Sequence, residues 1–551
     1  MRAALRRPGT VVFLLASALY LLAGVVVTAR HQILLGDALA RVASASSAVH
    51  GQSPGLTSLG FVFPPLTALA QLPLVALDPI APWLTVDGMS AVIVSALFAA
   101  GTVVQLDGIA RDRGVRALVR VPVVVVFAVN PMIVFYAANG MSEAPCLFFL
   151  VWAVRRLIRW ADDDDVHELI VAGIALALAY LTRYDGAVAT AAAGVLVFVI
   201  TWRRARGERR FGTAFMDLNL VAAPGLAAFL AWALAGWMIT GDLFAQFSSR
   251  YGNSAILAQT GGADGAAASP AAMSAMSFVI LAPTLPVLLV CAAVVQRRRP
   301  VVLAAPLAVF GAVLLFQTAT FLSGGTFGFL RFTITAIPLA AILALFATPA
   351  GRAVTSPRPG RFRWMGAPPG PPRRSVVAPT VAVLALVAAL PVTTVGMGSP
   401  IYAAQEFALR TVFAGPADTG PELDRARRTA LAFATERRIA EYLDAKGLPR
   451  ASVAVDTASG FAIVARSQRP LQFIETADPD FTQAVNAPTR HGVRYLLTVP
   501  PTGRGEADAL NLRYPTLFEN GAGVAELEVE ARNDAPDQPD WRLYRVLGAG
   551  S

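Results

Sequence analysis

Long apolar runs, separated by short polar segments, fill the first 398 residues of the chain. A helix needs about 20 consecutive apolar residues to cross the hydrocarbon core of a membrane. On this criterion we expect eleven spans, at residues 10–29, 89–109, 119–137, 143–158, 168–183, 186–202, 218–240, 275–296, 301–321, 331–349 and 376–398. The pattern predicts a polytopic α-helical membrane protein with about 11 transmembrane helices.

A further apolar run, at residues 61–80, differs from the others because four prolines interrupt it and no arginine flanks it. Proline removes a backbone hydrogen bond and bends or breaks a helix. We therefore expect an interfacial helix here instead of a twelfth span. It would lie in a first outer loop that covers residues 30–88.

The arginines indicate how the spans are oriented, since cytoplasmic loops of membrane proteins collect basic residues. With the N-terminus in the cytoplasm, the inner segments contain 24 arginines, and the outer loops contain only Arg30, Arg41, Arg183, Arg250 and Arg331. The first span is then an uncleaved signal anchor. The stretch at residues 351–375, rich in Pro, Gly and Arg, is expected to be a cytoplasmic linker.

Residues 399–551 have a different pattern, in which a charged helical segment is followed by short strand-like runs. We expect a helix at 421–445 and strands at 451–456, 471–474, 493–499, 524–530 and 541–547. An odd number of spans places this segment outside the cytoplasm. The chain is thus predicted to consist of a transmembrane domain, residues 1–398, and an extracytoplasmic α/β domain, residues 399–551.

Composition agrees with a membrane location and excludes other classes of protein. With 55% hydrophobic and 15% charged residues, the chain of 551 residues is too apolar for an ordinary soluble enzyme. Its net charge of +10 divides into +13 for the transmembrane domain and −3 for the C-terminal segment. The basic residues lie scattered between apolar runs, which is typical of topology signals and not of a nucleic-acid groove. The near absence of Lys points to a bacterium with a GC-rich genome.

Charged residues at the outer ends of the spans are the candidates for function, because polar groups are costly at membrane depth. Asp37 follows the first span, in a segment whose apolar residues recur with helical spacing. The spacing predicts an amphipathic helix at the outer interface with Asp37 near its polar face. The structural alternative is an ion pair between Asp37 and Arg41 at i, i+4, which contributes a few tenths of a kcal/mol.

A second acid, Glu143, ends a segment that joins two spans through an Asn-Gly turn. Ser142 is a candidate cap for the helix that follows, and Glu143 would complement the dipole at the start of that helix. This structural role is compatible with a catalytic one.

Two outer arginines lie at the membrane boundary. Arg183 precedes Tyr184 in the hairpin between two long spans, and Arg331 precedes a later span. The structural alternative is that such an arginine only extends its guanidinium group to the membrane–water interface. A guanidinium at headgroup depth is also suited to a lipid phosphate, and we favour phosphate binding for Arg331.

The order of these motifs resembles the GT-C superfamily of integral-membrane glycosyltransferases. The similar branch is the one related to protein O-mannosyltransferases and the aminoarabinose transferase of lipid A, glycosyltransferase family 39. The resemblance covers about the first 400 residues. It rests on Asp37, the Phe-Pro-Pro-Leu sequence at 63–66, the segment that ends at Glu143, the Leu-Thr-Arg-Tyr hairpin at 181–184 and Arg331.

The resemblance implies transfer of a sugar, a hexose or a pentose, from a polyprenyl phosphate to an acceptor on the outer face of the cell membrane, with inversion at the anomeric carbon. Asp37 would be the general base and Glu143 would orient the acceptor or support the base. Arg183 and Arg331 would stabilise the departing phosphate, and Arg41 and Tyr184 would also bind substrate. The acceptor can be a lipid, a glycan or a protein.

Two other functions fit a polytopic chain, namely transport and a non-catalytic scaffold of the envelope that binds through its C-terminal domain. A transporter is disfavoured because the sequence has no internal repeat and no paired broken spans. A scaffold would not need Asp37 or the outer arginines. No nucleic-acid partner is expected. A divalent metal, Mg²⁺ or Mn²⁺, stays open because Asp37 and Glu143 are both oxygen ligands.

Overall fold

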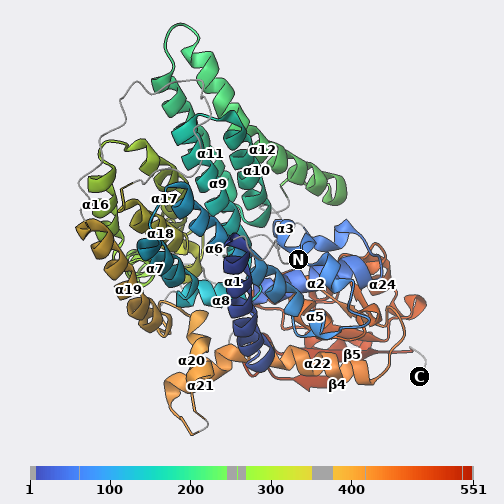
Figure 1. Cartoon of the computed structure of the whole chain (residues 1–551). Coiled ribbons are helices and arrows are strands. Elements are labelled where there is room, and N and C mark those ends of the chain that lie inside the picture. The colour runs from blue at the N-terminus through green and yellow to red at the C-terminus, as the bar shows by residue number, and fades with distance from the viewer. Residues whose placement is uncertain are drawn as a thin grey trace.

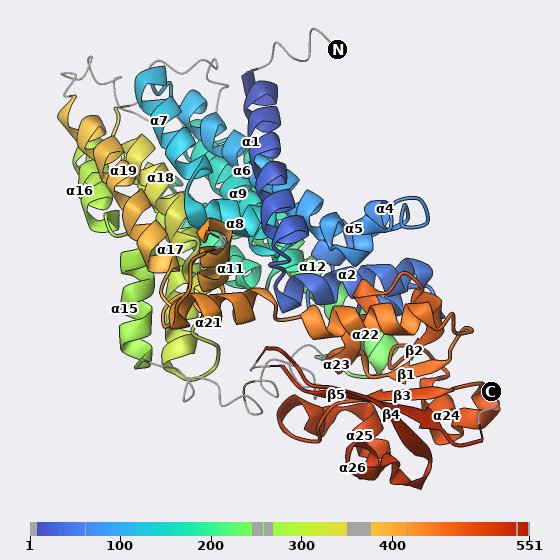
Figure 2. The same cartoon turned by 90° about the horizontal axis from the view of Figure 1, so that it is seen from below.

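The computed structural model describes residues 8–60, 62–244, 257, 268–349, 376–415, 417–535 and 538–548. Figures 1 and 2 show a helical bundle with a smaller sheet-containing domain at one end. The expected linker at 351–375 and the outer arginine at position 250 lie outside the described residues.

The bundle contains a helix in each segment that the apolar pattern predicts as a span. In chain order these are α1 (Pro8–Gly24), α6 (Met89–Asp112), α7 (Ala117–Ala128) with α8 (Pro131–Ala138), α9 (Glu143–Asp163), α10 (Val166–Thr182), α11 (Asp185–Arg204), α12 (Arg210–Thr240), α15 (Pro270–Leu281) with α16 (Leu285–Gln296), α17 (Val301–Leu322), α18 (Ala336–Phe346) and α19 (Val377–Met397). A π-helical turn, Val25–Arg30, extends α1.

Six helices of the described chain are long and apolar enough to cross a membrane, or up to eight spans if each of two bent pairs counts as one. The expected count of eleven is therefore not established. The helix α10 and the segment Leu330–Phe346 are apolar but shorter than a full span. The chain is a polytopic α-helical membrane protein.

Two of the expected spans, 119–137 and 275–296, are not single helices. The helices α7 and α8 meet at 53°, and α15 and α16 meet at 61°. Between α7 and α8 the Asn130 side chain accepts hydrogen bonds from the backbone N–H groups of Met132 and Ile133 and so starts a new helix. Pro131 and Pro283 lie at the two breaks, where proline cannot donate the hydrogen bond that a continuous helix needs.

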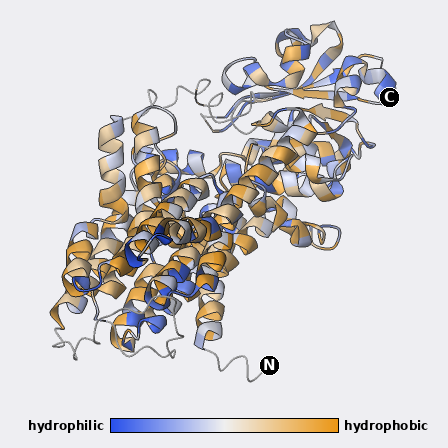
Figure 3. Ribbon diagram, turned by 90° about the horizontal axis from the view of Figure 1, so that it is seen from above, coloured by the Kyte–Doolittle hydropathy of each residue, from blue (hydrophilic) through white to orange (hydrophobic). Residues whose placement is uncertain are grey.

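Many large hydrophobic side chains of the bundle are exposed, and Figure 3 shows a larger share of hydrophilic residues in the C-terminal domain. On α12, Leu226, Leu230 and Leu234 follow one another at four-residue intervals, and between 48% and 58% of each is exposed. A row of large apolar residues facing outward is what a helix in contact with lipid requires.

The first outer loop forms α2 (Gly36–His50), a 3₁₀ turn η2 (Leu56–Leu59), α3 (Leu66–Leu69), α4 (Leu72–Val75) and α5 (Trp83–Val86). The amphipathic helix expected around Asp37 is confirmed as α2. A single interfacial helix over 61–80 is wrong, since the segment is divided into the short helices α3 and α4. The prolines of this run interrupt regular helical hydrogen bonding.

The C-terminal segment folds into a five-stranded sheet with the order β2-β1-β3-β5-β4. The strands are β1 (Val453–Val455), β2 (Phe473–Glu475), β3 (Tyr495–Thr498), β4 (Ala525–Ala531) and β5 (Trp541–Val546), each within a residue or two of an expected strand. Both neighbours of β1 are parallel to it, and β5 is antiparallel to β3 and β4. The helices α22 (Ala434–Ala445) and α23 (Thr457–Arg466) pack on one face of the sheet.

The expected helix at 421–445 is interrupted at 431–433, which separates α21 (Pro421–Ala430) from α22. The opposite face of the sheet is covered by α24 (Phe481–Asn486), α25 (Ala509–Arg513) and α26 (Leu517–Asn520). Figure 2 shows these two layers on either side of the strands. The expected α/β architecture is confirmed.

The sheet domain rests on the first outer loop. The helix α23 packs against α2, and Ser47 of α2 donates a hydrogen bond of 2.8 Å to Glu475. Arg437 forms an ion pair of 3.0 Å with Asp87, which follows α5. These contacts place the C-terminal domain next to the loop that carries Asp37.

Candidate active site

Four charged residues from separate elements meet where the bundle joins the first outer loop. Arg331 Nη2 lies 2.9 Å from Asp37 Oδ2, and Arg331 Nε lies 3.4 Å from Glu143 Oε1. Arg183 Nη1 lies 2.6 Å from the same oxygen of Glu143. The structure thus brings together Asp37, Glu143, Arg183 and Arg331, which we call the charged cluster.

Glu143 enters the cluster from the first turn of α9, as expected. The preceding turn contains Gly140 with φ of +75°, and its backbone N–H donates to Ser95 Oγ at 3.2 Å. A Cβ at Gly140 would lie 2.6 Å from the Cβ of Ala91, so only glycine lets the turn pack so closely on α6. The expected cap is wrong, because the Ser142 side chain makes no capping hydrogen bond.

Arg183 lies in extended backbone between α10 and α11. Its Nε contacts Asp185 Oδ2 at 2.8 Å, and Gln317 of α17 donates a hydrogen bond to the other oxygen of Asp185. Asp185 therefore fixes one edge of the guanidinium while Glu143 holds the other. This geometry keeps Arg183 at the cluster without the freedom of a surface arginine.

Arg331 lies in a 3₁₀ turn, η4 (Leu330–Thr333), immediately before α18. Its guanidinium lies 4.8 Å from the ring centre of Phe329 and 5.3 Å from that of Phe332. Aromatic faces attract cations, so they stabilise the charge of a buried guanidinium without occupying all its donors. Arg331 is thus held between two carboxylates and two rings.

The other two predicted binding residues lie beside the cluster. Arg41 does not form the ion pair with the Asp37 carboxylate that was the structural alternative for this acid. Its Nη1 donates to the backbone carbonyl of Asp37 at 2.9 Å, because Arg331 occupies the carboxylate. Its guanidinium also lies 4.4 Å from the ring centre of Phe63. The Tyr184 hydroxyl donates to the backbone carbonyl of Val62 at 3.2 Å.

The two acids of the cluster differ in accessibility. The Glu143 side chain is fully enclosed and the Arg331 side chain is 5% exposed, whereas 36% of the Asp37 side chain is exposed. Burial alone would raise the pKa of Asp37, but the nearby charges of Arg331, Arg41 and Arg183 outweigh it and lower that pKa. Asp37 is therefore an ionised carboxylate that a molecule outside the protein can reach.

Two further acids lie near the cluster: Asp185, an outer acid to which sequence reasoning gave no role, and Glu406, which it missed. Glu406 follows α19 and accepts a hydrogen bond of 2.5 Å from the Tyr136 hydroxyl of α8. Burial raises the pKa of Glu406. Its isolation in an apolar stretch after the last span is the one signal in the sequence, since an unpaired acid is costly there.

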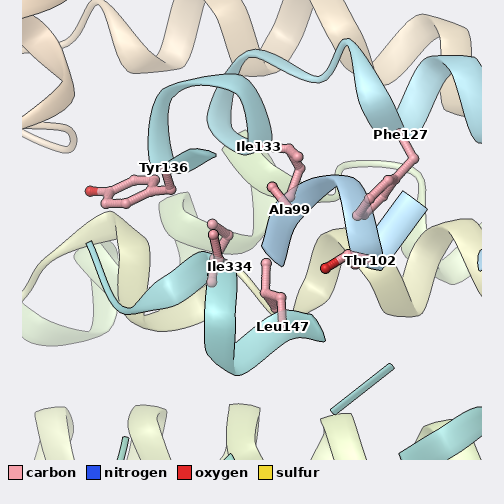
Figure 4. A pocket seen from close by; sticks show the side chains of 8 residues that line it. Ala99, Thr102, Phe127, Ile133, Tyr136, Leu147 and Ile334 are labelled. Carbon is pink, nitrogen blue, oxygen red and sulfur yellow. The ribbon is translucent and has the colours of Figure 1, made fainter. Parts of the chain in front are cut away.

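An apolar pocket lies within the bundle (Figure 4). It is lined by Ala99, Thr102, Phe127, Ile133, Tyr136, Ala144, Leu147 and Ile334. Ala144 directly follows Glu143, and Ile334 lies three residues beyond Arg331. The free volume of the pocket is about 10 Å³, which is room for about one water molecule, so it is a packing gap of the bundle and no ligand is assigned to it.

The residues present do not fit a divalent metal. Within the described ranges, no group of three or more His, Cys, Asp and Glu side chains lies close enough together to hold an ion. Each acid of the cluster also faces a guanidinium, whose charge would repel a cation. We therefore assign no step to a metal.

Comparison with known proteins gives a match in structure. No family model matches the chain, and no curated protein matches its sequence. ArnT from Cupriavidus metallidurans bound to undecaprenyl phosphate is similar with a TM-score of 0.52 at 15% identity, over 98% of this chain and 99% of that chain. The same protein in the apo state gives a TM-score of 0.53 at 15% identity, over 97% of each chain.

The similarity extends over the bundle, the outer loop and the C-terminal domain, since nearly the whole length of both chains is covered. The aminoarabinose transferase branch is also the one that the motifs of this chain resemble. The chain therefore has the fold of ArnT.

Proposed function

We propose that this protein transfers a sugar from a polyprenyl phosphate to an acceptor at the outer face of the membrane. The convergence of Asp37, Glu143, Arg183 and Arg331 carries the proposal. Two arginines for a phosphate and an accessible carboxylate for a hydroxyl proton are the groups that such a transfer needs. The likeness in fold to a protein solved with undecaprenyl phosphate supports the choice of donor.

The phosphate of the donor competes with Asp37 for Arg331. Without substrate, the guanidinium is bound to the Asp37 carboxylate. When phosphate oxygens take over its donors, Asp37 loses the interaction that most lowers its pKa. Its pKa then rises, because one of the positive charges that lower it is shared with the phosphate. Donor binding thereby makes Asp37 a stronger base at the moment that a base is required.

In the transfer step, the acceptor hydroxyl oxygen attacks the anomeric carbon and Asp37 takes the hydroxyl proton. The bond between the anomeric carbon and the phosphate oxygen breaks, and the polyprenyl phosphate leaves with the electron pair. Arg331 and Arg183 offset the charge that develops on the phosphate. Attack opposite to the leaving group inverts the anomeric carbon.

Glu143 acts by position and not by proton transfer in this mechanism. It is fully enclosed and contacts Arg183 at 2.6 Å and Arg331 at 3.4 Å. Its negative charge therefore holds the two guanidiniums close together against their mutual repulsion. Arg41 and Tyr184 form the edge of the site toward the outer loop, where substrate would enter.

Binding of undecaprenyl phosphate to the purified protein in lipid nanodiscs tests the phosphate role. Arg331→Ala is expected to weaken binding about tenfold or more, since it removes charge-assisted hydrogen bonds. Arg30→Ala is the matched control. Arg30 is an exposed outer arginine at the end of the π-helical turn, and it does not belong to the charged cluster. Equal affinities for both variants would contradict the proposal.

A further inference from the structure

Three phenylalanines of one short segment form a row of rings that ends at the charged cluster. Phe327 and Phe329 are stacked with 5.3 Å between their ring centres, and Phe329 and Phe332 meet edge to face at 5.6 Å. All three rings are partly exposed. We call Phe327, Phe329 and Phe332 the aromatic row.

The backbone of the segment explains the order of the rings. Phe329 is extended, with φ of −80° and ψ of 131°, and side chains two residues apart point to the same side of an extended chain. Phe327 therefore lies beside Phe329. The 3₁₀ turn η4 follows, and residues three apart lie above one another in such a turn, which brings Phe332 next to Phe329.

Gly328, between the first two rings, determines which side of the segment faces the bundle. A Cβ at Gly328 would lie 2.7 Å from the ring of Phe321 in α17 and 3.3 Å from the side chain of Met273 in α15. A larger residue would push the segment off these helices. Since Gly328 faces α17, its neighbours Phe327 and Phe329 point away from that helix.

Both arginines proposed for the donor phosphate lie against the aromatic row. The Arg331 guanidinium is 4.8 Å from the ring centre of Phe329 and 5.3 Å from that of Phe332. The Arg183 guanidinium is 5.5 Å from the ring centre of Phe332. In a polyprenyl phosphate, a single oxygen joins the phosphorus to the first isoprene unit. A phosphate held by these arginines therefore brings that unit next to the rings.

The chemistry of the row favours a hydrocarbon over a sugar. Phenylalanine has no side-chain donor or acceptor for a hydrogen bond. Sugar hydroxyls buried against such rings would lose hydrogen bonds to water without replacement. Isoprene units are flat and apolar, and they cover exposed ring surface without this cost.

Resting on the proposed function, we infer that the aromatic row binds the isoprene units next to the phosphate of the donor. Phe329 and Phe332 also contact the arginines, whereas Phe327 contacts Phe329 and neither guanidinium of the described cluster. Phe327 therefore binds hydrocarbon without holding an arginine in place, and its substitution tests the inference most directly.

The test measures binding of undecaprenyl phosphate to the full-length protein in lipid nanodiscs. Phe327→Ala should weaken this binding about tenfold, because it removes the apolar contact of one ring. Phe327→Leu keeps a large apolar side chain and should retain most of the affinity. Competition by inorganic phosphate, which has no hydrocarbon, should be equally strong in Phe327→Ala and in the unaltered protein.

Phe215→Ala is the matched control. Phe215 also belongs to a stacked pair of rings, 6.1 Å from Phe211, and is 52% exposed on α12. This variant should bind undecaprenyl phosphate as the unaltered protein does. Unchanged affinity in Phe327→Ala would mean that the row faces only the lipids of the bilayer and would overturn the inference. Weaker competition by inorganic phosphate in Phe327→Ala would also overturn it, since the ring would then act through the arginines.

Arg331→Ala separates this inference from the proposed function, because it should weaken both the binding of undecaprenyl phosphate and the competition by inorganic phosphate. If Arg331→Ala has this effect and Phe327→Ala binds normally, only the inference about the aromatic row is wrong. If Arg331→Ala binds both molecules as the unaltered protein does, the proposed function itself fails.

Discussion

Asp37 combines accessibility with ionisation, which no other acid of the charged cluster does. Asp37→Asn keeps the shape of the side chain but removes the proton acceptor. Loss of a positioned base costs a transfer reaction about 10²- to 10⁴-fold in rate. We expect sugar transfer from a polyprenyl-phosphate donor to fall by this factor, while undecaprenyl phosphate still binds. The measurement is turnover by the purified variant under donor saturation.

A second acid of the outer loop provides the control for this substitution. Asp78 hydrogen-bonds to Thr85 within the loop. Asp78→Asn should retain the turnover of the unaltered protein. Normal turnover by Asp37→Asn would remove Asp37 as the base.

At the level of residues, the sequence was informative where a charge stood out against its surroundings. Asp37, Glu143, Arg183 and Arg331 were recognisable because each lies at the outer end of an apolar run, and the structure brings all four together. Their partners were not recognisable. Nothing local indicates that Arg331 pairs with Asp37, 294 residues away, in place of the nearby Arg41.

The helix α2 is the element that joins the site to the C-terminal domain. Asp37 lies in its first turn, and Ser47, ten residues later, donates to Glu475 of β2. Glu475 is buried in this contact, and Asp478 is a second acid beside it. Burial raises the pKa of Glu475 from 4.5 to about 7. The joint between the domains therefore contains a group that titrates near neutral pH.

The sign of the pH effect follows from this shift. Between about pH 4.5 and 7 the folded state holds a proton on Glu475 that the unfolded state has lost, so stability falls as pH rises through this range. The full effect is about 3 kcal/mol. Glu475→Gln keeps the hydrogen bond and cannot ionise. We expect it to raise the unfolding temperature relative to the unaltered protein at about pH 8.

At about pH 4.5 the same two proteins should unfold at similar temperatures, because the folded unaltered protein then has a neutral Glu475 and the variant has a neutral Gln at that position. The pKa of Asp508 is also raised to about 7, but a comparison at one pH cancels its contribution. Destabilisation by Glu475→Gln of equal size at both pH values would mean that the carboxyl group serves packing alone.

At the level of elements, periodicity predicted where helices form and failed on where they break. Each expected span contains helix, yet 119–137 and 275–296 bend by more than 50°. Hydropathy is averaged over a window of residues, so the predicted spans run on through Asn130 and Pro283. The break is decided by single residues that cap a new helix or lack a donor, and these carry little weight in such an average.

For the whole molecule, the distribution of arginines predicts that the C-terminal domain lies outside the cytoplasm. Labelling with a membrane-impermeant maleimide checks this orientation. Arg490→Cys places a thiol on the exposed surface of the C-terminal domain, and Glu208→Cys places one between α11 and α12. The native Cys146 is buried. A variant with Cys146 and Cys291 replaced by alanine gives the background.

We expect Arg490→Cys to react in intact cells and Glu208→Cys to react only after the cells are permeabilised. The physical reason is that loops rich in basic residues stay on the cytoplasmic side of the membrane. Reaction of Glu208→Cys in intact cells would reverse the orientation and place the charged cluster on the cytoplasmic side.

The docking of the C-terminal domain on α2 has a consequence for how firmly the proposed base is held. The arginines proposed for the donor belong to the bundle, whereas Asp37 lies on α2, on which a separate sheet domain docks together with α5 and through the Phe433–Phe461 pair. A change that loosened this docking would free α2 and with it Asp37, while Arg183 and Arg331 would keep their places in the bundle.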